Sequence, residues 1–177
     1  MPRRWRQSES PQPTPRSRAA VVVTGLLAVT FIAGFVFVPL MQNAGSPGAW
    51  WLRAAYAPLC HQMSERSIEL QGAPIAVCAR CTGLYLGGAL GLFLAAVLVV
   101  GRARRPRPFL LAWALAPTLI DALLPWVGLP GLPNLARLIV SVPAGVVAGV
   151  FLALGVAELF AQQTPVRSPE SLENLAP

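Results

Sequence analysis

Long runs of apolar residues, separated by polar segments, dominate this chain. The first uncharged run covers residues 20–41. As a helix it would reach about 33 Å, against a bilayer core of about 30 Å. Further runs cover 82–100, 109–127 and 138–160. The pattern predicts an all-α fold, an integral membrane bundle of four transmembrane helices within a membrane domain at 19–160.

The polar segments divide the chain further. Segment 42–81 forms one long connection between the first two runs, whereas the two later connections are short and predict antiparallel neighbours. The ends, 1–18 and 161–177, are rich in Pro, Ser and Gln, which predicts disordered tails. A secretory signal peptide is an alternative interpretation of the first run. That run is longer than a typical signal sequence, and the residues after it form a poor cleavage site.

Composition agrees with a membrane protein. Hydrophobic residues make up 55% of the chain and charged residues 12%, with a mean hydropathy of +0.58. The formal net charge is +7. The basic residues are all arginine and lie at the edges of apolar runs, without a basic recognition helix. We therefore expect the lipid bilayer, and no nucleic acid, as the partner.

The positions of the arginines predict an orientation. The N-terminal tail and the second connection carry most of them: Arg3, Arg4, Arg6, Arg16, Arg18, Arg102, Arg104, Arg105 and Arg107. Because positive charge accumulates on the cytoplasmic side, these segments and both termini should be cytoplasmic. We expect the plasma membrane as the location and the long segment 42–81 on its outer face.

Small residues recur at every fourth position on two of the predicted helices: Gly83, Gly87 and Gly91 on the second, and Gly145, Gly149 and Ala153 on the fourth. Such stripes permit close backbone approach, so we expect these two helices to touch. The alternative is that glycine is simply common in membrane helices.

An amphipathic segment precedes the cysteines. Trp50 and Trp51, with Arg53 and Tyr56, are typical of an anchor at the membrane surface. We expect a short helix over 49–63 that carries Cys60 and the residue after it along the outer surface.

All the cysteines of the chain and its one histidine lie within residues 60–81: Cys60, His61, Cys78 and Cys81. Three thiols and an imidazole form a Cys₃His ligand set, which is typical of structural zinc, although iron or copper also accepts thiolates. The CxxC lies where the second helix should begin. There the helix dipole and the charge of Arg80 favour thiolates.

The same conditions favour a redox nucleophile. A Cys78–Cys81 disulfide would leave one thiol over, whereas a metal would use all three thiols and His61. An oxidising outer compartment favours disulfide chemistry, and adjacent ligands at 60 and 61 need a bend in the backbone. Haem attachment needs CxxCH, but threonine follows Cys81. Ordinary buried cysteines remain a further alternative.

The third predicted helix carries an acidic residue within the membrane. Asp121 should lie roughly 9 Å from the outer end of its helix, where an unpaired carboxylate is costly. Arg137, at the outer start of the fourth helix, is the obvious ion-pair partner. Asp121 could instead belong to a polar site beneath the cysteines or reach the outer interface.

At these residues the chain resembles a family of small bacterial and archaeal membrane proteins classed as a domain of unknown function. The resemblance rests on Cys-His-Gln at 60–62, Arg-Ser at 66–67 and Cys-Ala-Arg-Cys-x-Gly-x-Tyr-x-Gly at 78–87. It extends to Asp121 and to Asn134 with Arg137, although Ala122 replaces the more usual glycine. The resemblance implies a multi-pass membrane protein with a polar outer site, and no established activity.

Three hypotheses follow. The first is a membrane protein with a metal held by Cys60, His61, Cys78 and Cys81, supported by Arg80, Asp121, Asn134 and Arg137. The second is a membrane thiol-disulfide oxidoreductase that uses Cys78 or Cys81 as the nucleophile and Cys60 as the exchange partner. The third is an accessory subunit that binds a membrane-protein partner or a second copy. Whether the chain is an enzyme stays open, because no phosphate loop, Ser/His/Asp arrangement or paired carboxylates occur.

Overall fold

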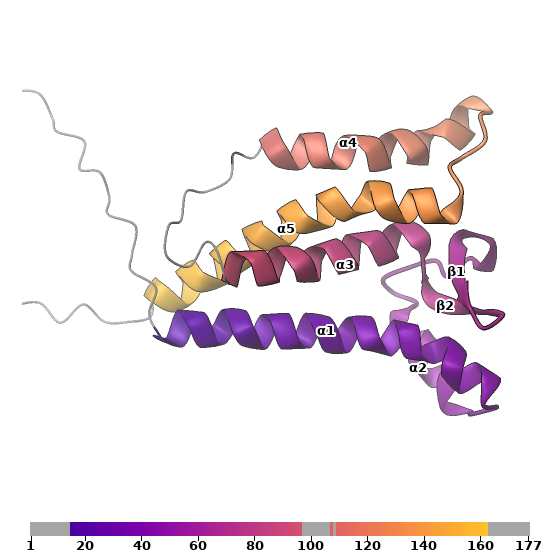
Figure 1. Ribbon diagram of the computed structural model, residues 1–177, viewed down its shortest axis with the longest axis horizontal. Coiled ribbons are helices and arrows are strands. Elements are labelled where there is room, and N and C mark those ends of the chain that lie inside the picture. Colours follow the sequence, from indigo (N-terminus) through magenta and orange to yellow (C-terminus); the bar gives the residue numbers. More distant parts are fainter. Residues whose placement is uncertain (1–14, 97–106, 108, 163–177) are drawn as a thin grey trace, which may run out of the picture.

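The structure is a computed structural model that describes residues 15–96, 107 and 109–162 (Figure 1). It is mostly helical, and its helices and strands follow in the order α1 (Pro15–Asn43), α2 (Gly48–Tyr56), η1 (Ser64–Arg66), β1 (Ser67–Leu70), β2 (Ala73–Cys78), α3 (Ala79–Leu94), α4 (Phe109–Leu123), η3 (Leu124–Val127) and α5 (Asn134–Gln162). Helix α1 thus begins within the segment predicted as a tail. The remaining tail residues, 1–14 and 163–177, lie outside the described part.

Three of the described helices are long and apolar enough to cross a membrane. They cover Arg18–Asn43, Phe109–Val127 and Asn134–Phe160. These match the first, third and fourth predicted runs. Helix α3 is shorter, with 16 residues that reach about 24 Å. The end of the second predicted run, 97–100, lies outside the described residues, so the structure supports three spans within a mostly helical membrane protein.

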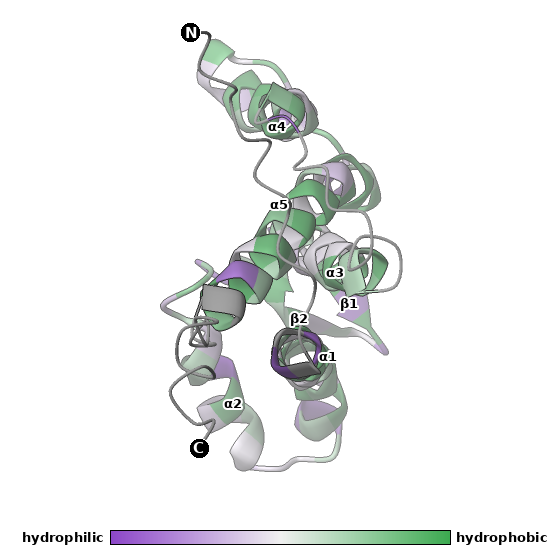
Figure 2. Cartoon of the chain, turned by 90° about the vertical axis from the view of Figure 1, so that its left-hand side faces the viewer, coloured by the Kyte–Doolittle hydropathy of each residue, from purple (hydrophilic) through white to green (hydrophobic). Residues whose placement is uncertain are grey.

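Helices α1, α3, α4 and α5 run in alternating directions (Figure 1). The short connection from α4 to α5 joins antiparallel neighbours, as predicted, whereas α3 and α4 do not pack on each other, because α5 lies between them. The surfaces of these helices are hydrophobic around much of the circumference (Figure 2), which is typical of helices surrounded by lipid. Helix α4 packs on α5 at the edge of this group and is the least buried of the three spans.

Helices α3 and α5 pack with their backbones in close approach. A side chain at Gly87 would overlap the carbonyl oxygen of Val142, and one at Gly149 would overlap the carbonyl oxygen of Gly88. Larger residues would force the two helices apart. The predicted contact between these two glycine-bearing helices is therefore confirmed.

The segment between α1 and α3 is not the simple loop and helix expected. Helix α2 ends at Tyr56, so the prediction of a helix over 49–63 is wrong beyond that residue. An all-α fold is also wrong here, because β1 and β2 pair as an antiparallel hairpin. Gln71 and Gly72 join the strands with φ angles of 54° and 81°, the left-handed conformation of a tight two-residue turn.

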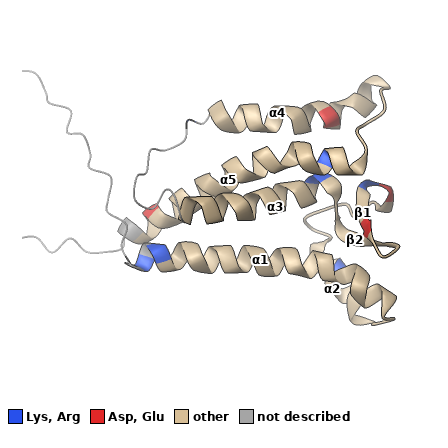
Figure 3. Ribbon diagram, in the orientation of Figure 1, with Lys and Arg blue, Asp and Glu red and all other residues tan. Residues whose placement is uncertain are grey.

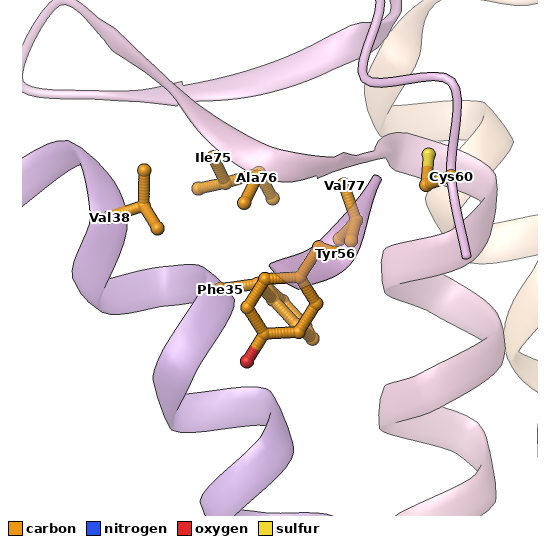
Figure 4. Close-up of a cluster of buried hydrophobic side chains, with 7 residues drawn as sticks. All are labelled: Phe35, Val38, Tyr56, Cys60, Ile75, Ala76 and Val77. Carbon is orange, nitrogen blue, oxygen red and sulfur yellow. The ribbon is translucent and has the colours of Figure 1, made fainter. Parts of the chain in front are cut away.

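The hairpin packs against the end of α1. Phe35 and Val38 of α1 contact Ile75 and Val77 of β2 in a buried cluster that also holds Tyr56 and Cys60 (Figure 4). The Tyr56 hydroxyl donates a hydrogen bond of 2.7 Å to the carbonyl oxygen of Phe31. The hairpin, α2 and the cysteines thus form one packed cap at a single end of the helices (Figure 1).

Candidate metal centre

Three separate elements bring the cysteines together. Cys60 lies in the turn after α2, Cys78 ends β2, and Cys81 lies in the first turn of α3. All three are free thiols, and their sulfur atoms lie within 4.8 Å of one another. Across the described residues, these are the His, Cys, Asp and Glu side chains that come close enough together to share one metal ion.

Cys60 is held in place by backbone contacts. Its own N–H donates to the carbonyl oxygen of Tyr56 at 3.1 Å, and its sulfur accepts a 3.1 Å hydrogen bond from the N–H of Cys78. The Cys60 side chain is buried, whereas those of Cys78 and Cys81 are half-buried. The cluster therefore has an inner side fixed by packing and an outer side that a small ion or partner can reach.

Two hydrogen bonds between α2 and the following turn hold the backbone in place next to Cys60. Gln62 has a φ of 55°, which is unusual for a residue other than glycine. Its side-chain amide donates to the carbonyl oxygen of Arg53 at 2.7 Å, and the Arg53 guanidinium donates back to the carbonyl oxygen of Gln62 at 3.2 Å. This reciprocal pair of hydrogen bonds holds the bend in the backbone after Cys60, a bend that leaves the His61 side chain exposed.

His61 does not join the thiols. Its side chain is exposed, and its ring nitrogens are not among the ligand atoms that lie within 4.8 Å of one another. The structure therefore groups three of the four residues expected from sequence.

The first turn of α3 favours a thiolate at Cys78. The neighbouring Cys81 thiol, which donates toward the Cys78 sulfur, lowers the pKa of Cys78 to about 5. Partial burial opposes this shift in pKa, while backbone N–H groups at the start of α3 add to it. Thiolate is the form that binds metals and attacks disulfides, so Cys78 is prepared for either chemistry at neutral pH.

The spacing of the sulfurs suits a metal ion. In a tetrahedral site with Zn–S distances of about 2.3 Å, two sulfurs lie roughly 3.8 Å apart. The three thiols lie within 4.8 Å of one another, a range that includes this spacing.

Asp121 pairs with two arginines rather than with one. Its carboxylate is fully buried and lies 2.5 Å from the Arg80 guanidinium and 3.6 Å from Nε of Arg137. The expected partner, Arg137, is thus present at the longer distance. Sequence reasoning had assigned Arg80 to the thiolates and missed its ion pair with Asp121.

Asn134 takes a structural position at the same end of the helices. Its side-chain amide donates to the carbonyl oxygens of Glu65 at 3.1 Å and Ser67 at 3.0 Å, which joins the start of α5 to the start of the hairpin. Together these residues line a surface hollow with Ser64, Ile68, Glu69 and Leu135, and none of the three cysteines lines it.

Two residues near the thiols were not singled out as site residues from sequence. Gln62 sets the turn after Cys60, and Tyr85 packs against the cluster that contains Cys60. Tyr85 lies four residues after Cys81, one helical turn away on the same face of α3. That spacing in the sequence could have indicated that Tyr85 lies near the thiols.

Comparison with known proteins agrees with the membrane character of the chain. A family model described as a predicted membrane protein (DUF2085) matches residues 60–151, a range that includes the three cysteines, Asp121 and Arg137. No solved structure matches the chain.

Two uncharacterized archaeal proteins are similar over much of their length. One, from Methanocaldococcus jannaschii, is 30% identical over 122 residues, which cover 65% of this chain and 78% of that protein. Another, from Methanothermobacter thermautotrophicus, is 34% identical over 88 residues, which cover 50% of this chain and 78% of that protein. This chain belongs to the DUF2085 family of predicted membrane proteins, a family of unknown function.

Proposed function

We propose that this chain is a multi-pass plasma-membrane protein that holds a metal ion, Zn²⁺ by ligand type, at its extracytoplasmic face. Cys60, Cys78 and Cys81 supply three thiolate ligands. The observation that carries the proposal is the approach of three free sulfurs, from three elements, to within 4.8 Å. Iron and copper(I) also accept thiolates and are alternatives for the same ligands.

His61 is the proposed fourth ligand. It directly follows Cys60 in a turn rather than in a helix, so a local change in that turn would carry its ring toward the ion. A closed set of four protein ligands is typical of structural zinc. In that role the ion would fasten the segment between α1 and α3 to the first turn of α3.

The proposed topology has four spans with both termini cytoplasmic. Helix α3 lies alongside α1 and α5, so we propose that the second predicted run, 82–100, which α3 covers up to Leu94, is the fourth span. Arg16 and Arg18, in the first turn of α1, lie at the opposite end of the helices from the hairpin (Figure 3). The positive-inside rule supports that end as cytoplasmic and the thiols as extracytoplasmic.

Elemental analysis of protein purified in detergent, without chelator or nickel, tests the metal site. We expect about one zinc or iron per chain and thiols that react only after the metal is removed. Cys78→Ser and Cys81→Ser should lose the metal. His61→Asn should weaken binding if the imidazole is a ligand and leave it unchanged if the thiolates suffice.

A matched control distinguishes the loss of a metal ligand from a general loss of protein stability. Ser141→Ala removes a buried hydroxyl on α5 that donates to the carbonyl oxygen of Arg137 at 2.8 Å and is not part of the thiol cluster. It should keep its metal. Absence of metal from the wild-type protein, with two cysteines unreactive until reduced, would overturn the proposal.

Thiol-disulfide exchange is the second candidate, favoured by the lowered pKa of Cys78. The Cys78 thiolate would attack a partner's disulfide and release one partner thiolate. Cys81 would then attack that mixed disulfide and release the second. The partner gains two electrons as its disulfide becomes two thiols, and the CxxC becomes a disulfide. A reduction potential measured on the metal-free protein, and its loss in Cys78→Ser, would test this candidate.

A further inference from the structure

Arg80 lies between the two cysteines of the CxxC, yet its side chain is bound elsewhere. Its Nε donates to Oδ2 of Asp121 at 2.5 Å, and its terminal NH2 donates to the backbone carbonyl oxygen of Asp121 at 3.1 Å. Both contacts reach one residue of α4. Two-point binding of this kind fixes the direction of the guanidinium as well as its position.

Asp121 is itself held from three sides. Its side chain is fully buried, and its Oδ1 accepts a 2.8 Å hydrogen bond from the N–H of Leu132 in the connection before α5. Arg137 of α5 adds its charge at 3.6 Å. Since a buried carboxylate is stable only with such partners, these contacts keep Asp121 in one place and make it a fixed point for Arg80.

The backbone connects Arg80 to the thiols. Cys81 directly follows Arg80 and Cys78 lies two residues before it, so contacts that hold Arg80 restrain the start of α3, where both cysteines lie. The N–H of Cys78 in turn donates to the sulfur of Cys60. Asp121 is thus linked to the three sulfurs through Arg80 and the start of α3, although it is not a member of the thiol cluster.

We propose that Asp121 is a positioning residue for the metal site, acting through Arg80 to hold the CxxC turn in the geometry that binds the ion. This inference rests on the proposed metal-binding function. Removing a residue that orients the ligands of a metal site typically changes the affinity for the metal by about 10- to 100-fold. We expect an effect of that size from Asp121.

The test is the affinity of the full-length protein for Zn²⁺, measured by competition with a chromophoric chelator, together with the absorption spectrum of the Co²⁺-loaded protein. Asp121→Asn keeps the shape of the side chain but places an uncharged amide against Arg80. It should bind Zn²⁺ about 10- to 100-fold more weakly and alter the thiolate bands of the Co²⁺ spectrum. Asp121→Glu restores the carboxylate and should recover part of the affinity.

Thr118 provides the matched control. It lies one turn before Asp121 on α4, and its hydroxyl donates to the carbonyl oxygen of Val140 at 3.1 Å and contacts the Ser141 hydroxyl at 3.3 Å. Thr118→Val removes these contacts between α4 and α5 without touching Arg80. Wild-type affinity in Asp121→Asn, or an equal loss in both variants, would overturn the positioning role.

Two further measurements keep the inference testable. If Asp121→Asn does not fold, Arg80→Lys replaces it, because lysine keeps the charge but loses the two-point contact, and it should weaken binding in the same range. If wild-type protein binds no metal, the proposed function fails. The positioning role is then judged by the alkylation rates of Cys78 and Cys81, which Asp121→Asn should change and Thr118→Val should not.

Discussion

The backbone N–H of Cys78 donates a hydrogen bond to the sulfur of Cys60 across 3.1 Å. This contact joins the turn after α2 to the end of the hairpin, and both segments pack against α1. The sulfur of Cys60 therefore has a structural role even without a metal. The two roles of Cys60 can be separated by substitution.

Cys60→Ser and Cys60→Ala should differ in stability but not in metal binding. Serine keeps an oxygen that accepts the Cys78 N–H, whereas alanine leaves that N–H without an acceptor, at a cost of about 1 kcal/mol or more. Both variants lack the thiolate ligand and should lose the metal. Thermal unfolding of the metal-free proteins in detergent should rank wild type first, serine next and alanine last. Equal stability of the two variants would show that the hydrogen bond contributes nothing.

The contact between α3 and α5 depends on the absence of a side chain at Gly87. Gly87→Ala places a methyl group against the carbonyl oxygen of Val142, which must push two backbones apart. We expect a loss of about 1–3 kcal/mol in the free energy of unfolding, measured by titrating the detergent-solubilised protein with a denaturing detergent.

Gly155 of α5 is the control for that substitution. A Cβ at Gly155 would meet nothing within 4 Å, so Gly155→Ala should be neutral or slightly stabilising. If both alanine variants unfold at the same detergent concentration, the close approach of α3 and α5 does not contribute to stability.

Gly34 and Tyr56 form a second pair suited to a double-mutant cycle. A Cβ at Gly34 would overlap the Tyr56 hydroxyl, which donates to the carbonyl oxygen of Phe31 at 2.7 Å. Gly34→Ala alone should be destabilising, because it displaces that hydroxyl, and Tyr56→Phe alone should cost about 1 kcal/mol. The double variant should be more stable than the sum of the two losses predicts, since phenylalanine removes the overlapping atom. Strictly additive losses would contradict the overlap.

Those features of the fold that depend on composition and on the spacing of residues were predicted from the sequence. Long apolar runs predicted the spans, and glycines four residues apart predicted the contact between α3 and α5, because bilayer thickness and helix geometry leave few alternatives. Sequence reasoning did not find the hairpin at 67–78. The strands are short, and the turn carries Gln71 where asparagine or glycine would be the usual signal.

The candidate site was likewise predicted only in part. The clustering of three cysteines was predicted, because all three lie within residues 60–81 and two of them form a CxxC where a helix begins. The partner of Arg80 was not, since Asp121 is 41 residues away and two candidate arginines lie at similar depth. The positions of α3 and α5 relative to α4 decide which guanidinium reaches the carboxylate at 2.5 Å and which stays at 3.6 Å, because Arg80 lies on α3 and Arg137 on α5.

The unusual turn residue gives the last prediction. Gln71 has a φ of 54°, a conformation that asparagine adopts more readily and that a β-branched residue strongly disfavours. Gln71→Asn should match or slightly exceed the wild-type melting temperature, whereas Gln71→Val should lower it. Both variants keep the backbone carbonyl that accepts the 3.2 Å hydrogen bond from the Asn43 side chain, so the comparison isolates the turn conformation. Equal melting temperatures for the two variants would mean that this turn does not limit the stability of the cap that holds the cysteines.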